Sequence, residues 1–443
     1  VSLDAGFRIT PTEIHSIVSN LRPEEHDEKI SQLIILLAKK GIKNTLTVIE
    51  NLHDTHLEDD FHRFLVQYLK KGFPVTGLEP KTPLSKALHM TLYEVSLPEK
   101  SADERERALK ELLSGMEQFY AGMLSVSPEK SPSENHIVLE IANSNGSDEF
   151  VFYVSVPTDK SDLFEKQILS IFHTAKVIPV PDDHNIFNSE GISVGSVAVA
   201  GGNPIFPCKT YDAFDHDPMN VILNTFSKIS RDGEGACMQV LMAPSGNYYH
   251  KKYKEALEKI EKGTPVKEAI DIAFTITDDL VHTFKDLFKS SKKKNDPSKP
   301  EEPKVIDQQA LERIRTKMSK SIVHVTVRLA ASAADTARAE SILSDLESGF
   351  NQFESTQGNS LKFKRKKGSD ATEFFRNFTF RAFNRSEAIP LNLSELTSLI
   401  HFQMADLHGV SQLKTIKAGI APAPLDLPQE GTLLGINKFR NIE

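Results

Sequence analysis

Two short stretches of alternating residues decide the fold: Leu92-Tyr93-Glu94-Val95-Ser96-Leu97 and His324-Val325-Thr326-Val327-Arg328-Leu329. Each predicts a β-strand, because side chains in a strand point alternately to opposite faces of the sheet. A helical pattern follows each one and ends in Ser114-Gly115-Met116-Glu117-Gln118-Phe119 or in Ser348-Gly349-Phe350-Asn351-Gln352-Phe353. The copies differ by a two-residue loop insertion, so the sequence predicts two related strand-helix modules.

The residues after the first helix extend this pattern. Two β-rich runs, residues 137–141 and 150–154, flank an Asn145-Gly146 pair that favours a hairpin turn. A helix at 163–172 and a strand at 176–180 complete the order β-α-β-β-α-β, which is that of a ferredoxin-like sandwich. In the second module we expect strands around 361–363 and 374–380, and a helix over 394–403.

The sequence therefore predicts an α+β fold, with a helical N-terminal domain followed by two duplicated ferredoxin-like α/β sandwich modules and a helical insertion between them. Apolar residues at helical spacing, such as Ile30, Leu33 and Leu37, indicate the N-terminal helices. The predicted boundaries are a helical bundle domain at 1–80, a first α+β module at 81–248, a helical hairpin at 249–288, a flexible linker at 289–304, a second α+β module at 305–410 and an extended connector at 411–443.

Composition limits the classes of function. The 443 residues and 49.4 kDa give room for two or three domains, and the net charge of −8 with a pI near 6.1 argues against a globally basic nucleic-acid coat. The two cysteines, Cys208 and Cys237, are too few for a disulfide framework. No apolar run approaches the roughly 20 residues that cross a bilayer. Because the chain starts at Val1, we expect any membrane anchor to lie upstream of it.

Motifs of known enzyme classes are missing from the sequence. It has no Gly-x-x-x-x-Gly-Lys-Ser/Thr phosphate loop, no dinucleotide fingerprint and no Gly-x-Ser-x-Gly nucleophile elbow. We therefore predict no catalytic residue, no cofactor and no enzymatic activity in this segment.

One cluster has residue types that bind metals: His53, His56 and His62, with Asp54, Asp59 and Asp60 among them. On a helix, His56, Asp59, Asp60 and His62 do not share one face, whereas a metal-binding helical pair usually stands four residues apart. A solvated helix start is the favoured interpretation, and we predict no metal. A metal-dependent hydrolase remains an alternative hypothesis.

A basic and aromatic patch is the candidate nucleic-acid site. Its cations are Lys362, Lys364, Arg365, Lys366, Lys367 and Arg376. Phe363 lies among them, and Phe374, Phe375, Phe378 and Phe380 follow. Cations and aromatic rings on a sheet can hold phosphates and stack bases. The alternative, which we favour, is an ordinary hairpin with a charged tip and a phenylalanine-lined core.

Three further segments complete a resemblance to a known arrangement. They are residues 217–228, the run Gly233-Glu234-Gly235-Ala236-Cys237-Met238-Gln239-Val240-Leu241, and the closing Gly431-Thr432-Leu433-Leu434-Gly435-Ile436-Asn437. Together with the first module they resemble the region that precedes the motor in DNA-translocating ATPases of type IV secretion and conjugation, of the TraG/TraD and HerA/FtsK kind. The resemblance covers about residues 87–443.

By this resemblance, the segment would be the non-catalytic platform of a DNA pump whose ATPase domain follows Glu443. The resemblance implies a homo-oligomer, by family a hexamer, with secretion-channel proteins and DNA as partners. It implies a cytoplasmic location, including the inner face of the bacterial membrane, with the membrane reached only through a segment outside this chain. The alternative hypothesis is a freestanding nucleic-acid-binding or scaffold protein.

Overall fold

The computed structural model describes residues 28–79, 82–98, 105–125, 136–181, 183–275, 306–403 and 413–414. Residues 1–27 of the predicted helical bundle domain, the linker at 289–304 and nearly all of the connector at 411–443 lie outside these residues.

In the first half of the chain, helices and strands alternate in the predicted order. The elements are α2 (Glu28–Leu52), α3 (Thr55–Lys70), α4 (Pro83–Leu88), β1 (Met90–Ser96), α5 (Arg105–Ser125), β2 (Ile137–Asn143), β3 (Phe150–Pro157), the 3-10 turn η5 (Thr158–Lys160), α6 (Ser161–Ile171) and β4 (Lys176–Pro179).

The second half contributes the longest strands and a helical insertion. Its elements are β5 (Ile192–Ala200), η6 (Tyr211–Ala213), α7 (Met219–Phe226), β6 (Gly235–Pro244), α8 (Tyr248–Glu261), α9 (Val266–Thr275), α11 (Gln308–Met318), β7 (Ile322–Ala333), α12 (Thr336–Ser348), η7 (Asn351–Phe353), β8 (Leu361–Arg365), α13 (Ser369–Thr379), η8 (Arg385–Glu387), β9 (Ile389–Asn392) and α14 (Leu393–Leu399).

All these strands form one 9-stranded antiparallel sheet. Its order is β4-β1-β3-β2-β6-β7-β5-β8, with β9 paired to one end of β7. The two halves of the chain meet where β2 pairs with β6, with Glu140 opposite Gln239. Strands β2, β6 and β7 are buried along their whole length, because helices or loops cover both faces of the sheet there.

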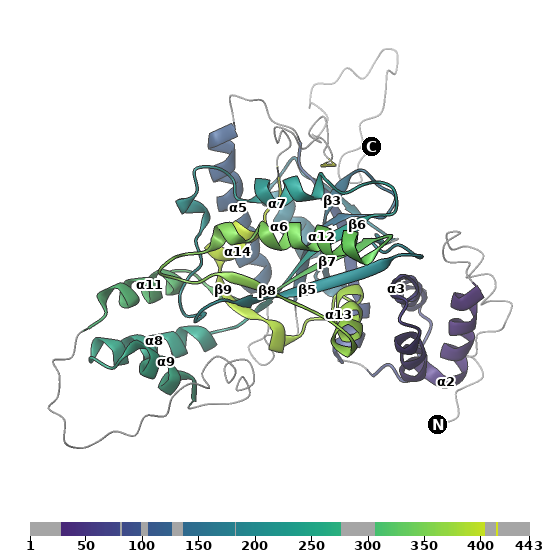
Figure 1. Ribbon diagram of the computed structural model, residues 1–443, viewed down its shortest axis with the longest axis horizontal. Coiled ribbons are helices and arrows are strands. Elements are labelled where there is room, and N and C mark those ends of the chain that lie inside the picture. Colours follow the sequence, from purple (N-terminus) through teal and green to yellow (C-terminus); the bar gives the residue numbers. More distant parts are fainter. Residues whose placement is uncertain are drawn as a thin grey trace, which may run out of the picture.

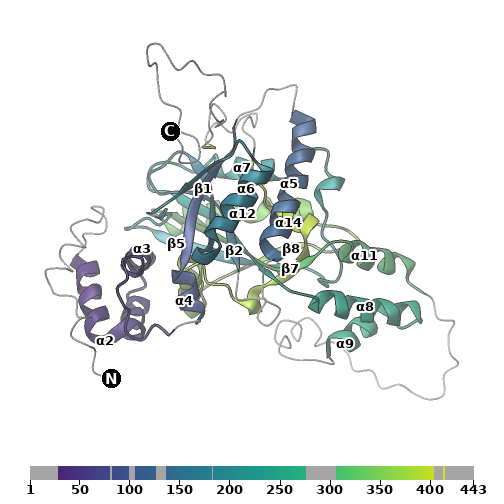
Figure 2. The same ribbon diagram turned by 180° about the vertical axis from the view of Figure 1, so that it is seen from behind.

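The two faces of the sheet are covered differently. Helices α5, α6, α7, α12 and α14 pack on one face around a large apolar core that includes Phe119, Phe164 and Leu223. Helix α13 covers the middle of the other face through Phe374, Phe375 and Phe378. Helices α8, α9 and α11 project from one end of the molecule, and α2 and α3 lie at the opposite end (Figures 1 and 2).

The predicted N-terminal helices are confirmed in the described residues. Helices α2, α3 and α4 share their own apolar core, which includes Leu33, Phe61 and Phe64. Helix α2 is kinked at Gly41, where φ is 77°. A side chain at this position would place its Cβ 2.8 Å from the backbone oxygen of Thr76, so only glycine fits without a shift.

The mixed α+β class is confirmed, and a strand followed by a helix occurs at both expected places, as β1 with α5 and β7 with α12. The two units do not hold equivalent places in the sheet, because β1 lies beside the edge strand β4 whereas β7 lies in the middle, between β6 and β5. The expected strand at 374–380 is wrong: residues 374–379 lie in α13, and Phe380 ends this helix. Three of the phenylalanines there recur at the spacing of one helical face, so burying them together favours a helix over a strand.

The second module also differs from expectation. The sequence predicts that it completes its own sheet from residue 305 onward, but β5, from residues 192–200, lies between β7 and β8. Residues 192–200 belong to the expected first module, at 81–248, and nothing in their local sequence identifies β7 and β8 as their partners. The two expected modules therefore share one continuous sheet.

Candidate functional site

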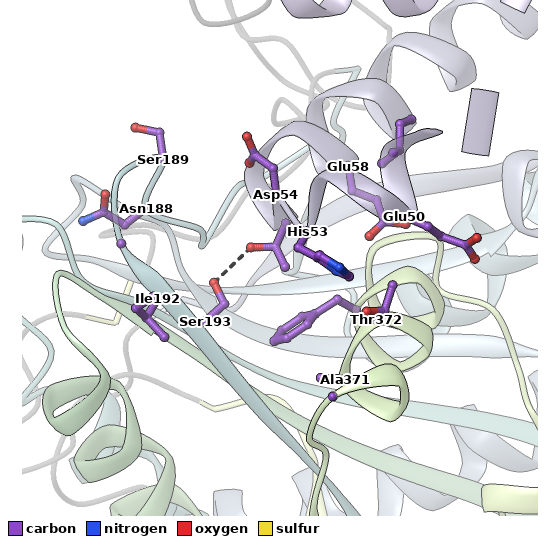
Figure 3. A pocket seen from close by; sticks show the side chains of 15 residues that line it. Glu50, His53, Asp54, Glu58, Asn188, Ser189, Ile192, Ser193, Ala371 and Thr372 are labelled. Carbon is purple, nitrogen blue, oxygen red and sulfur yellow. Dashed lines mark hydrogen bonds between the residues drawn. The ribbon is translucent and has the colours of Figure 1, made fainter. Parts of the chain in front are cut away.

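A pocket of about 330 Å³ lies where the N-terminal helices meet the sheet. We call it the joint pocket. Its walls come from the connection between α2 and α3, the segment leading into β5, and the first turns of α13 (Figure 3). The lining residues are Ile49, Glu50, His53, Asp54, Thr55, Glu58, Asn188, Ser189, Gly191, Ile192, Ser193, Gly368, Ala371, Thr372 and Phe375.

The acidic side of the joint pocket is held by an arginine. Arg376 of α13 forms ion pairs with Glu50 of α2 and, through Nε at 3.4 Å, with Glu58 of α3. Asp54 caps α3 by accepting a hydrogen bond from the Leu57 amide at 3.0 Å. The two ion pairs of Arg376 hold α2 and α3 against α13.

A chain of hydroxyl groups closes the other side of the joint pocket. Thr55 Oγ1 lies 3.1 Å from Ser193 Oγ, the contact drawn as a dashed line in Figure 3. Ser193 Oγ donates to Ser332 Oγ at 3.1 Å, and Ser332 Oγ accepts a hydrogen bond from the Asn188 amide. The α3 start is thereby tied to the inner strands β5 and β7.

Glu58 is the titrating group of the joint pocket. Glu58 is only 4% exposed. Burial raises the pKa of its carboxyl to about 7, although the charge of Arg376 lowers this pKa. This carboxyl can therefore exchange a proton near neutral pH, within a pocket large enough for a small polar molecule. Because Arg376 already faces both glutamates, the arrangement first serves to join the helices to the sheet.

We predict that Glu58→Gln changes the pH dependence of stability. A raised folded-state pKa gives a stability contribution that is present below the unfolded value near 4.5 and is lost as pH rises through about 7. Glutamine does not titrate, so from about pH 5.5 to about pH 8 the variant should gain about 2 kcal/mol relative to the wild type. Urea unfolding of both proteins across this range measures the difference. A flat difference would contradict the buried carboxyl.

Beside the joint pocket, a layer of buried charged and polar side chains lies on the central strands of the sheet. It is the middle of a cross-strand row that runs, in register, Ile178, Glu94, Tyr153, Glu140, Gln239, Arg328, Val197 and Lys364. Gln239 Nε2 donates to Glu140 Oε1 at 2.7 Å, and Arg328 Nη1 donates to Gln239 Oε1 at 3.1 Å. The residues Glu140, Gln239 and Arg328 are each at most 1% exposed.

Arg381 links this layer to the N-terminal helices. Its guanidinium donates two hydrogen bonds of 2.9 Å to Glu140 and also pairs with Asp183. Burial opposes ionisation of Asp183, but Arg381 and His184 hold the pKa of this carboxyl well below its usual range. On α3, Nδ1 of His62 lies 4.0 Å from the carboxylate of Asp183. Burial lowers the pKa of the His62 imidazole to about 3. The buried carboxylates Glu140 and Asp183 therefore depend on Arg381 for their opposite charge.

The cations of the predicted nucleic-acid patch are divided among several surroundings. Arg365 pairs with Glu347 at 3.0 Å, Lys366 pairs with Glu387 at 2.8 Å, and Arg376 pairs with Glu50 and Glu58, two residues that line the joint pocket. Lys362, Lys364 and Lys367 are exposed. Phe374, Phe375, Phe378 and Phe380 are at most 5% exposed, so their rings face the interior and lie outside the reach of a base.

The three histidines considered as metal-ligand candidates, His53, His56 and His62, have different surroundings. His53 lines the joint pocket, His56 Nδ1 lies 3.2 Å from Asp60, and His62 packs edge-on against Phe380. Within the described ranges, no group of three or more histidine, cysteine, aspartate or glutamate side chains could hold a metal ion. No described helix is both long and apolar enough to span a bilayer.

Sequence reasoning missed Glu58, Arg381 and Asp183 as interacting residues. Their partners are far away in sequence: 318 residues separate Arg376 from Glu58, and 241 separate Arg381 from Glu140. The sequence does hold one signal: Glu140 and Arg328 are charged residues within largely apolar central strands. Because a buried charge requires a partner, these two residues indicate that oppositely charged or polar side chains lie close to them.

A search of curated proteins finds no match to this chain. A family model described as a domain of unknown function, DUF8128, matches residues 83–408, which include the whole sheet but not α2 and α3. The match covers more than half of the 443 residues. The chain therefore belongs to the DUF8128 family.

Proposed function

We propose that this chain is a non-catalytic assembly platform that engages partner proteins or DNA in a DNA-translocating ATPase of type IV secretion or conjugation. The proposal starts from the resemblance of residues 87–443 to the region preceding the motor in such ATPases. Under it, the chain forms a homo-oligomer, by resemblance a hexamer, works in the cytoplasm or at the inner face of the membrane, and contacts secretion-channel proteins. ATP hydrolysis belongs to a separate motor domain.

One observation carries the proposal, namely the repeated strand order. From the outer edge inward, one half of the sheet runs β4-β1-β3-β2 and the other runs β8-β5-β7-β6. In each half the chain order is strand, helix, two strands, helix, strand, with α8, α9 and α11 inserted between β6 and β7. This order supports two ferredoxin-like halves joined edge to edge, with β2 and β6 equivalent. A duplicated scaffold of this kind favours assembly over catalysis.

The buried ion pairs among the described residues are consistent with an assembly role. The buried ionisable groups considered above are paired across elements, as in the Glu140–Arg381–Asp183 layer, and such pairing fixes how elements dock. The α8-α9-α11 arm and the α2-α3 unit extend the molecule at opposite ends (Figure 1). Both extensions offer surface for contacts with other subunits.

Affinity purification of the chain from its source cells, together with native mass spectrometry, tests the proposal. We expect a homo-oligomer, with six subunits as the leading expectation, that co-purifies with a phosphate-loop ATPase activity and secretion-channel components. The purified chain alone should hydrolyse no ATP. A monomer with no such partners, or ATP hydrolysis by the isolated chain, would overturn the platform role. A monomer that binds DNA alone would support the freestanding nucleic-acid-binding alternative.

A further inference from the structure

Strand β8 ends the sheet on one side. Among the described strands it pairs only with β5, with Ser196 opposite Arg365 and Ala200 opposite Leu361. The Lys366 amide donates to the Gly195 oxygen at 2.9 Å and the Gly201 amide donates to the Ser360 oxygen at 2.8 Å. Even-numbered residues of β8 therefore bond to β5, because bonded and non-bonded pairs alternate in an antiparallel ladder.

The backbone groups of the odd-numbered residues point the other way. Leu361, Phe363 and Arg365 direct their amide and carbonyl groups toward the free edge of the sheet. A groove of about 370 Å³ lies along this edge, between α12, η7 and β8. Its walls include Ser344, Glu347, Ser348, Asn351, Glu354 and Lys362. The groove gives an added strand room beside backbone groups that no other described strand pairs with.

Charge distinguishes the two faces of β8 at this edge. Arg365 shares the face of α12, where Glu347 and Glu340 neutralise it. Lys362 and Lys364 are exposed and point to the opposite face. Side chains directly across two paired strands are neighbours, so every second residue of an added strand would lie beside these lysines.

Lysines on an edge strand normally discourage pairing with another strand. A partner strand with acidic residues at alternate positions reverses this effect, because each added carboxylate would offset a lysine charge. Base stacking is not available here, since the phenylalanines of α13 are buried and Phe363 packs against Phe350 with ring centroids 4.9 Å apart. Chemistry at this edge therefore favours a peptide over a nucleic acid.

We propose that the free edge of β8 binds an extended segment of a partner protein, with acidic side chains at alternate positions, as an added β-strand. Main-chain hydrogen bonds to Leu361, Phe363 and Arg365 would supply binding, and Lys362 and Lys364 would select acidic residues. This inference rests on the proposed partner-engaging function and names the chemistry of one partner.

The test uses a fluorescent short peptide that alternates glutamate with valine or threonine, titrated with the full chain and followed by fluorescence anisotropy. Arg365→Pro removes an outward amide without touching the bonds to β5, and proline is tolerated on a free edge. Arg365→Ala is the matched control, because both variants lose the ion pair with Glu347. We expect Arg365→Pro to bind about fivefold to tenfold more weakly than Arg365→Ala.

Two further measurements keep the test independent of how Arg365→Pro folds. On the wild type, a peptide with alternate backbone amides methylated should lose binding, because it cannot pair with an edge strand. Lys362→Glu with Lys364→Glu should weaken binding of the acidic peptide by about tenfold and reverse the preference toward a lysine-containing peptide.

Other results would overturn the inference. Equal peptide affinity of Arg365→Pro and Arg365→Ala, or undiminished binding of the methylated peptide, would exclude strand addition. Single-stranded DNA bound more tightly than the peptide, with no effect of proline, would assign the lysines to phosphate. Self-association blocked by Arg365→Pro, without peptide binding, would make a second copy the occupant. Because partner co-purification is measured separately, the edge hypothesis can fail while the platform function stands.

Discussion

Replacement of Arg381 by methionine is expected to lower the free energy of unfolding by about 3 to 5 kcal/mol. The guanidinium is almost fully buried and lies between Glu140 and Asp183, whose side chains are 1% and 12% exposed. Methionine fills much of the same volume but leaves two buried carboxylates without their cation. The loss is large because a charge in the protein interior depends on its partner far more than an exposed charge does.

The backbone of Arg381 also contacts a neighbouring element, and methionine keeps this contact. Its φ is 50°, a left-handed conformation that is uncommon for residues other than glycine, and its backbone oxygen accepts a hydrogen bond from His136 Nε2 at 2.8 Å. The residue therefore connects the end of α13, strand β2 and the loop at Asp183. We expect α3, whose His62 faces Asp183, to loosen from the sheet in the variant.

Guanidinium chloride unfolding at neutral pH measures the effect of Arg381→Met. The matched control is Arg315→Met, which breaks an ion pair with Glu261 at 2.6 Å in which both side chains are more than 40% exposed. That change should cost less than about 1 kcal/mol. Adding Glu140→Gln and Asp183→Asn to Arg381→Met should recover part of the stability. Equal losses for Arg381→Met and Arg315→Met would show that the layer is dispensable.

Replacement of His324 by glutamine is expected to make the protein relatively more stable in acid. His324 is 2% exposed and its Nδ1 lies 3.1 Å from the hydroxyl of Tyr249. Burial, together with the charge of Arg385, lowers the pKa of this imidazole to about 3. The folded protein therefore keeps His324 neutral at pH values where the unfolded chain binds a proton.

The sign of the pH effect follows from this difference. A depressed folded-state pKa gives a contribution that is present above the unfolded value near 6.5 and is lost as pH falls toward about 3. Between about pH 7 and pH 4, the wild type should lose about 3 kcal/mol relative to His324→Gln, which does not titrate. This direction is opposite to the one expected for Glu58→Gln.

Urea unfolding of the wild type and the variant at several pH values gives the difference directly. His173→Gln is the control, because His173 is exposed on the loop after α6. Its difference from the wild type is measured across the same range for comparison. If the His324→Gln difference is equally constant, His324 is not held neutral by the fold.

Much of the local structure is visible in the sequence. The alternation in residues 92–97 and 324–329 predicts β1 and β7, and Asn145-Gly146 predicts the hairpin between β2 and β3, where Gly146 has a φ of 82°. Helical spacing predicts α2 and α3. These features depend on side-chain periodicity and turn geometry, which act between residues close together in the chain.

The wrong prediction at α13 also has a physical cause. A run containing Phe374, Phe375, Phe378 and Phe380 fits the composition of a strand, and phenylalanine favours strands in isolation. Packing on the second face of the sheet favours the helix, which buries three of these rings as one surface. Composition alone does not distinguish these outcomes, because tertiary burial outweighs intrinsic preference.

By itself, the sequence determined the α+β class, the strand-helix units and the positions of the helices at the N-terminus, because each depends on neighbouring residues. Only the tertiary structure decided that β5 enters between β7 and β8, that Arg376 joins Glu50 and Glu58, and that Arg381 joins Glu140 and Asp183. These pairings connect residues more than a hundred positions apart. Strand register and ion pairing at such separations depend on how the whole chain buries its apolar surface. A local sequence pattern cannot predict these long-range contacts.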